Sequence, residues 1–403
     1  MDRARGMTGW SESSHSAPIS RKQVTTLRSR ALDKEGILRR IDWVLVGATA
    51  ALCVIGCALV WAATKPQGLG QSYLKKDVLN VAIGVVLAIV AASVDYRTLR
   101  AYTPVLYVLS VLGLVVVLSP LGQTVNGAHS WIALGGGFEI QPSEFAKVAV
   151  VLGIAMLLSE RREGSGEPTT QDVVLSLGFA AVPVLLILAQ PDVGSIMVFA
   201  FIIFGMLALS GIRGRWVVGL LLAALLGVVV IAKLHLLHKY QIARITSFEH
   251  LDSSNSAGSQ GYGFNQAQAR IAIGHGGIFG QGLGHGTQTN GQFVPEQQTD
   301  FVFSVAGEEL GLVGAGLIVL LEGVILWRAL RIARLAEDRF GMLLAVGIVC
   351  WFGFQMFENI GMNLGIMPIT GLPLPFVSYG GTSMFASMIA IGLLQNVHIR
   401  TQR

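Results

Sequence analysis

The chain has 403 residues, of which 52% are hydrophobic and 13% are charged. An average soluble protein carries about 25% charged residues, and so few charges cannot cover the surfaces of soluble domains. The net charge of +5 does not point to nucleic acid, because Lys and Arg of membrane proteins collect in cytoplasmic loops. The composition excludes an ordinary cytosolic enzyme and indicates an integral membrane protein.

Ten apolar stretches are long enough for helices that cross a bilayer, which takes about 20 residues. We therefore predict an all-α integral membrane fold with ten transmembrane helices in residues 41–399. The predicted helices cover residues 41–64, 78–94, 103–122, 145–160, 173–190, 195–211, 217–236, 301–327, 340–365 and 382–399.

Charge predicts the orientation of these helices. With the N-terminus in the cytoplasm, 21 of the 29 Lys and Arg residues fall on the cytoplasmic side and 7 on the other. This asymmetry predicts that both termini are cytoplasmic. Residues 1–40 are basic and have no apolar run, which predicts a disordered cytoplasmic tail, and residues 400–403 form a cytoplasmic C-terminus.

Residues 237–300 are predicted to form a long extracytoplasmic loop before the eighth helix. This segment keeps Ile, Phe and Val, and residues 274–286 contain seven glycines. It can therefore pack while its backbone approaches a ligand closely. Long loops without regular structure are usually functional or disordered, and this composition favours a function.

Common catalytic and nucleotide-binding signatures are missing from the sequence. The nucleotide-binding signature GxxxxGK[ST] is absent, which argues against an ATP-driven pump. The motifs HExxH, paired CxxC and GxSxG are also absent. His129, His275 and His285 all fall on the predicted outer side, but they lack the spacing of metal ligands. We predict no metal site from these residues.

Ionisable residues at membrane depth are costly, so they mark a functional interior or pair with one another. Glu144 and Lys147 share a helix face, where they form either a structural clamp or a polar wall for a charged headgroup. Asp192 lies in a short turn, where capping of the next helix is the favoured interpretation. Four more carboxylates in apolar helices need partners or water: Glu308, Glu309, Glu322 and Glu358.

Asp300 is the strongest catalytic candidate, at the end of the long loop and the start of the eighth helix. It is either a helix cap or a partly desolvated base that meets a substrate from the outer leaflet. Arg244 suits bidentate recognition of phosphate or, alternatively, snorkels to the interface. Residues 366–381 have three prolines, three glycines and no charge, which predicts a rigid re-entrant loop beside a cavity.

Six ordered motifs resemble those of the SEDS family of polytopic cell-wall proteins. The similarity runs from about residue 41 to residue 397, and residues 367–371 and 375–379 look more like the RodA-like branch than the FtsW-like one. The motifs are GAHSWIALGGGFEIQPSEFAK at 127–147, QPDVGS at 190–195, YQIARI at 240–245, IAIGHGGIFGQGLGHGTQT at 271–289, PEQQTDFVFSVAGEELG at 295–311 and GIMPITGLPLPFVSYGGTS at 365–383.

The resemblance implies an inverting peptidoglycan glycosyltransferase that polymerises lipid II during cell elongation. It implies Asp300 as the essential aspartate and general base, which takes the proton of the acceptor hydroxyl. The family often has a basic residue or His in the two positions before the Thr-Asp pair, and here these positions are Gln297 and Gln298. The expected substrate-binding residues are Arg244, Lys147, Glu144, Gln298, Asp192, Ser378 and Tyr379.

The resemblance also implies a bacterial cytoplasmic membrane as the location and a class B penicillin-binding protein as the transpeptidase partner. The cofactor is open, with a divalent cation such as Mg²⁺ as one option for the departing pyrophosphate. Two alternatives remain open at this point. One is a lipid II flippase, and the other is a non-catalytic scaffold that activates a penicillin-binding protein.

Overall fold

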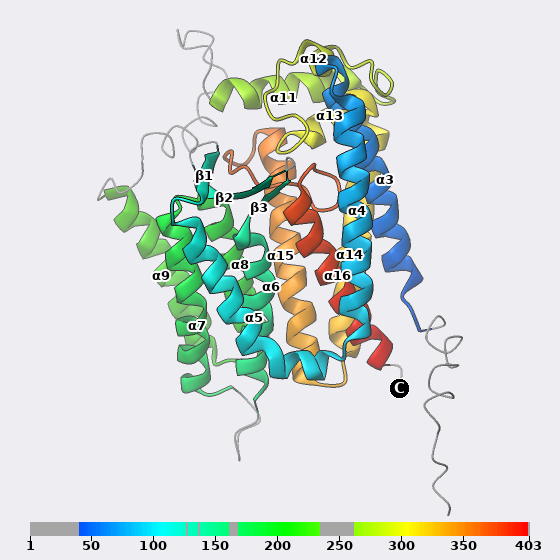
Figure 1. The fold of residues 1–403 in the computed structure, drawn as a ribbon. Coiled ribbons are helices and arrows are strands. Elements are labelled where there is room, and N and C mark those ends of the chain that lie inside the picture. The colour runs from blue at the N-terminus through cyan, green and yellow to red at the C-terminus, as the bar shows by residue number, and fades with distance from the viewer. Residues whose placement is uncertain (1–39, 126–127, 136–137, 161–167, 234–261, 402–403) are drawn as a thin grey trace, which may run out of the picture. The chain divides into compact units, whose positions relative to one another are not determined.

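The computed structural model describes residues 40–125, 128–135, 138–160, 168–233 and 262–401. Apolar helices of residues 41–401 run alongside one another in a bundle (Figure 1). The predicted tail of residues 1–40 lies outside the described residues, apart from Arg40.

Eight of the described helices are long and apolar enough to cross a membrane. Apolar helices α8 (Val193–Leu209) and α9 (Gly214–Lys233) occupy the sixth and seventh predicted spans. The helical membrane fold is confirmed, and the count of ten crossings stays a prediction. The eight are α3 (Trp43–Thr64), α4 (Gly70–Ser93), α5 (Tyr96–Val117), α6 (Pro142–Ser159), α7 (Thr170–Ala189), α14 (Gly311–Leu335), α15 (Arg339–Leu364) and α16 (Gly381–Thr401).

The eighth predicted span, 301–327, is wrong as a single helix. The chain forms α13 (Val302–Glu309) and then α14, with Gly311 at the junction in the left-handed region at φ +68°. A Cβ atom on Gly311 would lie 2.3 Å from the backbone nitrogen of Gly280. Only glycine combines this backbone angle with so close an approach to Gly280, so this junction requires glycine.

A small sheet was missing from the all-helical prediction. Strands β1 (Gly122–Val125), β2 (Ala128–Gly135) and β3 (Phe138–Ile140) pair antiparallel in chain order. The N–H of His129 donates to the carbonyl of Gln190 across 3.1 Å, and the Thr382 hydroxyl donates to the Glu139 carbonyl across 3.1 Å. These bonds fix the sheet to the end of α7 and the start of α16.

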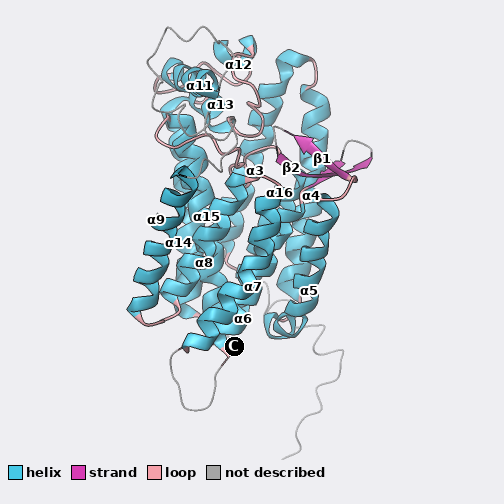
Figure 2. Cartoon of the chain, turned by 90° about the vertical axis from the view of Figure 1, so that its left-hand side faces the viewer, coloured by secondary structure: helices cyan, strands magenta, loops and turns pink. Residues whose placement is uncertain are grey.

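The described part of the predicted long loop is partly helical. It contains helix α11 (Tyr262–Gly276) and the short helix α12 (Thr287–Gly291), and residues 234–261 lie outside the described residues. Figure 2 shows α11, α12 and α13 at the same end of the bundle as the strands.

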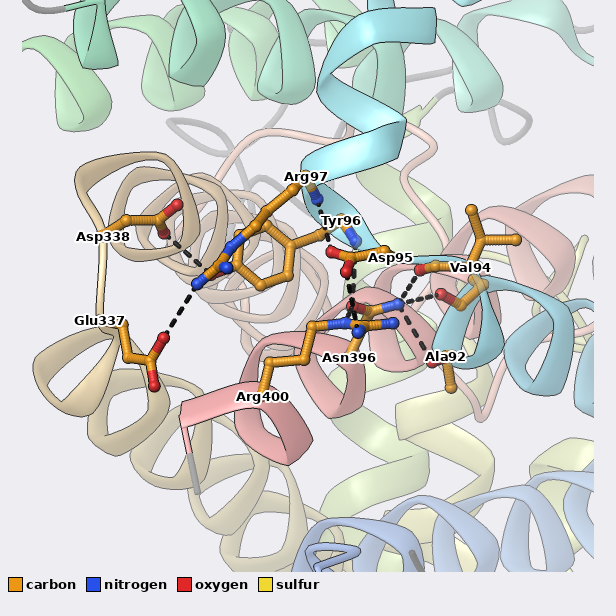
Figure 3. Close-up of polar contacts among 10 residues, drawn as sticks. Ala92, Val94, Asp95, Tyr96, Arg97, Glu337, Asp338, Asn396 and Arg400 are labelled. Carbon is orange, nitrogen blue, oxygen red and sulfur yellow. Dashed lines mark hydrogen bonds and ion pairs between the residues drawn. The ribbon is translucent and has the colours of Figure 1, made fainter. Parts of the chain in front are cut away.

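Polar contacts of Asn396 connect helices at the end of the bundle opposite the sheet (Figure 3). Its side-chain amide donates to the carbonyls of Ala92 at 3.0 Å and Val94, and its Oδ1 accepts the N–H of Tyr96 at 3.2 Å. The hydroxyl of Tyr96 donates to Asp338 Oδ1 across 3.0 Å. The α4–α5 turn, the start of α15 and the end of α16 are thereby joined.

The first and last helices meet at this same end. The N–H of Asp42, which caps α3, donates to Gln395 Oε1 of α16 across 3.0 Å, and Gln395 Nε2 donates back to the Asp42 carbonyl at 3.0 Å. The start of α3 and the end of α16 therefore lie on one side of the bundle. Which side faces the cytoplasm stays a prediction from the Lys and Arg count.

Candidate functional site

A cavity of about 600 Å³ lies at the end of the bundle that carries the sheet. Its walls come from α4, β1 to β3, the α7–α8 turn, the segment before α13 and the loop between α15 and α16. The lining includes four carboxylates, Glu139, Asp192, Glu296 and Asp300, and one Lys, Lys76. The apolar bundle thus presents a polar chamber formed by segments far apart in the sequence.

Asp300 lines this cavity and is half-buried. Its backbone carbonyl accepts hydrogen bonds from the side-chain amides of Asn359 at 2.9 Å and Asn363 at 3.2 Å, both on α15. Its N–H donates to the carbonyl of Glu296 across 3.1 Å. The N-cap of α13 is Phe301, and no side chain caps this helix. The structure therefore favours the cavity interpretation of Asp300 over the helix cap.

The re-entrant loop of residues 366–380 is tied to the segment that carries Asp300. The Ser378 hydroxyl donates to the Thr299 carbonyl across 2.6 Å and accepts the N–H of Leu374 at 2.8 Å. The N–H of Tyr379 donates to the carbonyl of Gln298 across 2.9 Å. Ser378 and Gln298, both expected to bind substrate, are outside the cavity lining and hold these two segments together instead.

Tyr379 itself lines the cavity, as expected of a substrate-binding residue. Its ring lies against that of Tyr73 on α4, with 4.9 Å between the centroids. Burial, followed by the nearby Tyr73, Asp77 and Glu139, raises the pKa of Tyr379 to about 12. The phenol therefore keeps its proton at neutral pH and can donate a hydrogen bond into the cavity.

Asp192 serves as both a cap and a wall of the cavity. Its Oδ1 accepts the N–H of Ser195 at 3.0 Å, which caps α8, and its Oδ2 accepts the Ser195 hydroxyl at 2.7 Å. Gln141 Nε2 donates to the same Oδ2 across 3.1 Å. The capping interpretation is confirmed, and the same side chain also faces the cavity.

Glu144 and Lys147 form an ion pair of 2.7 Å whose side chains are 2% and 0% exposed. Lys147 Nζ also donates to Gln355 Oε1 across 3.2 Å and lies 4.9 Å from the centre of the Trp351 ring. Neither member of the pair lines the cavity. Gln355 in turn donates to the carbonyl of Pro373 in the re-entrant loop at 2.7 Å. This placement favours the structural clamp over the headgroup wall.

The two carboxylates that end α13 organise the glycine-rich segment. Glu308 accepts the N–H of Gln288 at 2.6 Å and both the N–H and the hydroxyl of Thr289 at 2.9 and 2.7 Å. Glu309 Oε2 accepts the N–H of Gly284 at 2.9 Å, and burial raises the pKa of Glu309 to about 7. Glu308 and Glu309 thus find their partners in backbone N–H groups of the segment 284–289 and in the Thr289 hydroxyl.

Arg244 lies outside the described residues, so its predicted phosphate contact has no structural description. Among the described residues, no three His, Cys, Asp or Glu side chains are grouped to hold a metal ion. In the described part of the chain, the four cavity carboxylates therefore do not form a group of three ligands for a divalent cation.

Sequence reasoning missed Lys76 and Asn80, which line the cavity from α4. A signal was present, because Tyr73, Lys76, Asn80 and Ile83 follow one another at helical spacing. The hydropathy pattern concealed it, since α4 begins at Gly70 rather than at residue 78. Glu139 and Trp131 were missed because the sheet that positions them was not foreseen.

This arrangement is suited to acid–base chemistry on a polar ligand. Asp300, a half-buried carboxylate whose backbone carbonyl is held by buried asparagines, shares the cavity lining with the phenol of Tyr379 and the amide of Asn80. A positioned carboxylate can remove the proton of a hydroxyl that attacks an electrophile. The exposed apolar side chains of α4, among them Val78 and Leu79 at 52% and 47%, leave one flank of the chamber suited to lipid.

The chain matches a family model described as FTSW_RODA_SPOVE, cell cycle protein, over residues 39–403. Stage V sporulation protein E of Bacillus subtilis is 37% identical over 378 residues, which cover 88% of this chain and 96% of that protein. Probable peptidoglycan glycosyltransferase FtsW of Geobacter metallireducens is 35% identical, covering 90% and 96%. Peptidoglycan glycosyltransferase MrdB of Escherichia coli is 34% identical, covering 86% and 90%.

Solved structures show the same fold. A chain from a structure described as structural coordination of polymerization and crosslinking by a peptidoglycan synthase complex matches with a TM-score of 0.72 and 31% identity, covering 89% of this chain and 97% of that one. Rod shape determining protein RodA of Thermus thermophilus matches with a TM-score of 0.65 and 29% identity, covering 90% and 98%.

Proposed function

Because this chain belongs to the FtsW/RodA/SpoVE family, we propose that it is a peptidoglycan glycosyltransferase that polymerises lipid II. Relatives that carry this activity in their names cover most of the chain at 34 to 35% identity. The observation that carries the proposal within the molecule is Asp300, which lines a chamber large enough for a sugar ligand. Small-ligand sites in proteins commonly occupy about 300–1,000 Å³.

Asp300 acts as the general base of the reaction. The 4-hydroxyl of the acceptor GlcNAc gives its proton to the Asp300 carboxylate while its oxygen forms a bond to the anomeric carbon of the donor MurNAc. The bond from that carbon to the diphosphate breaks, and undecaprenyl diphosphate leaves with the electron pair. A single displacement inverts the anomeric centre. General base catalysis of this kind contributes about 10²- to 10⁴-fold.

The chamber opens to the outer face of the bacterial cytoplasmic membrane, an orientation that rests on the Lys and Arg asymmetry. A class B penicillin-binding protein is the proposed partner, which cross-links the strands. The proposed role in elongation rests on the RodA-like residues 367–371 and 375–379. Identities of 34 to 37% with relatives named MrdB, FtsW and SpoVE do not separate these roles.

The test is polymerisation of lipid II by the purified protein in detergent, with and without the partner transpeptidase. Asp300→Asn and Asp300→Ala are expected to lower kcat by about 10² or more and to melt near the wild-type temperature. Asp95→Asn, a carboxylate that pairs with Arg400 at the opposite end of the bundle, is the control and is expected to retain the rate.

Other outcomes distinguish the alternatives. A wild type that makes no glycan in detergent but moves lipid II across vesicle membranes is a flippase, since a detergent micelle has no sides. A rate that Asp300→Asn leaves unchanged, but that depends on the partner, identifies a scaffold. Loss of the rate on chelation, restored by Mg²⁺, would identify the divalent cation that the sequence leaves open.

A further inference from the structure

Lys76 of α4 is the one Lys or Arg side chain that lines the cavity in the described part of the chain. It is half-buried, and it makes no hydrogen bond or ion pair with another described residue. The other candidate cation, Lys147, is fully buried in its pair with Glu144 and lies outside the lining. Lys76 is therefore the described cation that is available to an anionic ligand in this chamber.

A second polar group lies on the same face of α4. Asn80 follows Lys76 by one helical turn and also lines the cavity. It is 3% exposed, and its Oδ1 has no hydrogen-bond partner among the described residues. A buried acceptor without a partner costs free energy, so a ligand that donates a hydrogen bond to Asn80 Oδ1, such as a sugar hydroxyl or an amide N–H, gains affinity. Lys76 and Asn80 together form a ledge of polar groups on α4.

The ledge lies on a helix with an apolar outer flank, which suits an anionic group that is attached to a lipid chain. Lys76 lies six residues after the start of α4 at Gly70, about 9 Å along the axis at 1.5 Å per residue. On the outer flank of the same helix, Val78, Leu79, Val85 and Val86 are exposed. A ligand here can place an anionic group on the ledge while its hydrocarbon chain follows the apolar flank of α4.

The other charges of the cavity restrict where an anion can bind. Glu139, Asp192, Glu296 and Asp300 are all carboxylates, and they repel a phosphate group. Asp192 is already held by Ser195 and Gln141. An anionic ligand is therefore favoured beside Lys76 and disfavoured beside these carboxylates, which restricts its orientation.

We propose that Lys76 of this ledge binds the diphosphate of the polyprenyl-linked donor and stabilises it as it leaves, while Asn80 Oδ1 accepts a hydrogen bond from the sugar that the diphosphate carries. The choice of a diphosphate rests on the proposed function, since the same chemistry would also accept the phosphate of a phospholipid headgroup. The Lys76 ammonium donates to a non-bridging oxygen, and the charge that develops on the departing group is met by a fixed cation.

The binding test uses undecaprenyl diphosphate as the probe and purified full-length protein in a non-ionic detergent. Lys76→Gln is expected to weaken its binding about tenfold or more, because a hydrogen bond to a charged group is lost. Lys76→Arg keeps the charge and is expected to recover most of the affinity. Lys75→Gln is the matched control, since Lys75 is the exposed neighbour outside the cavity lining. Equal affinity of Lys76→Gln and wild type overturns the proposal, as does equal weakening by Lys75→Gln.

Two further measurements use the wild-type protein. The first distinguishes a polyprenyl diphosphate from a phospholipid headgroup, and the second tests Lys76 without a substitution. Phosphatidylglycerol is expected to compete poorly against undecaprenyl diphosphate, and equal competition would make the ledge a headgroup site. Undecaprenyl diphosphate is expected to protect Lys76, but not Lys75, of the wild type from an amine-reactive label read by mass spectrometry. Equal labelling of Lys76 with and without the probe overturns the proposal even if Lys76→Gln fails to fold.

A failure of this proposal can be distinguished from a failure of the proposed function. A wild type that binds undecaprenyl diphosphate through Lys76 but makes no glycan contradicts the polymerase and leaves the ledge intact. If the wild type makes glycan and Lys76→Gln binds the probe as well as the wild type does, the proposed function is supported and the role of Lys76 is overturned.

Discussion

The side-chain amide of Asn359 donates to the backbone carbonyl of Asp300 across 2.9 Å and to the carbonyl of Leu372 across 2.7 Å. One buried residue of α15 thus holds two walls of the cavity, the segment before α13 and the re-entrant loop. Because Asp300 precedes a short helix with no side-chain cap, its position depends on this amide and on that of Asn363.

Asn359→Leu is therefore expected to lower kcat for lipid II polymerisation by about tenfold or more, since small displacements of a catalytic group are costly. It also removes three side-chain hydrogen bonds, two that Asn359 donates and one that it accepts from Asn363, each of which contributes about 0.6–1.7 kcal/mol in membrane proteins. Asn396→Leu is the control, because Asn396 is equally buried and bonds backbone carbonyls at the other end of the bundle. It should lower the melting temperature but not the rate per folded molecule, and an equal loss of kcat in both variants contradicts the positioning role.

The buried pair of Glu144 and Lys147 predicts a loss of stability rather than of substrate binding. Lys147→Met leaves the Glu144 carboxylate buried without its cation, which costs about 3–5 kcal/mol. The double variant Glu144→Leu with Lys147→Met removes both charges and is expected to recover much of that loss. Thermal unfolding and KM for lipid II are the measurements. A stable Lys147→Met protein with a raised KM would instead favour the headgroup wall.

Two glycines of α11 provide a matched test of close packing. A Cβ atom on Gly276 would lie 1.9 Å from the carbonyl oxygen of Gly307 on α13, whereas nothing lies within 4 Å of one on Gly274. Gly276→Ala is expected to destabilise by about 1–3 kcal/mol through overpacking. Gly274→Ala is expected to be neutral or to stabilise by up to about 1 kcal/mol, because alanine favours a helix. Similar melting temperatures for the two variants would show that α11 and α13 do not pack this closely.

Glu309 gives the protein a pH-dependent stability. Burial raises its pKa from 4.5 to about 7 in the folded chain. The folded state thus binds a proton more tightly than the unfolded state, so this contribution is full below about pH 4.5 and is lost as pH rises through about 7. Glu309→Gln keeps an acceptor for the Gly284 N–H and is expected to flatten the fall in melting temperature between pH 5 and 8. An unchanged slope in this variant would contradict the assignment to Glu309.

Composition and hydropathy alone determined the membrane class and the approximate place of the long helices. This works because each crossing must bury about 20 apolar residues whatever its neighbours are. The motifs around Glu144, Asp192 and Asp300 also identified the family before any contact was visible. Local chemistry was sufficient for Asp192, since a turn before a helix specifies a cap through nearby backbone groups.

Only the tertiary structure decided which charges meet in the cavity. Lys76 and Lys147 both lie in apolar helices, and one lines the chamber while the other is buried in an ion pair. That difference depends on how each helix is rotated against its neighbours, and the helical spacing of Tyr73, Lys76, Asn80 and Ile83 does not by itself specify that rotation. The break at Gly311 and the sheet of residues 122–140 likewise arise from contacts between distant segments.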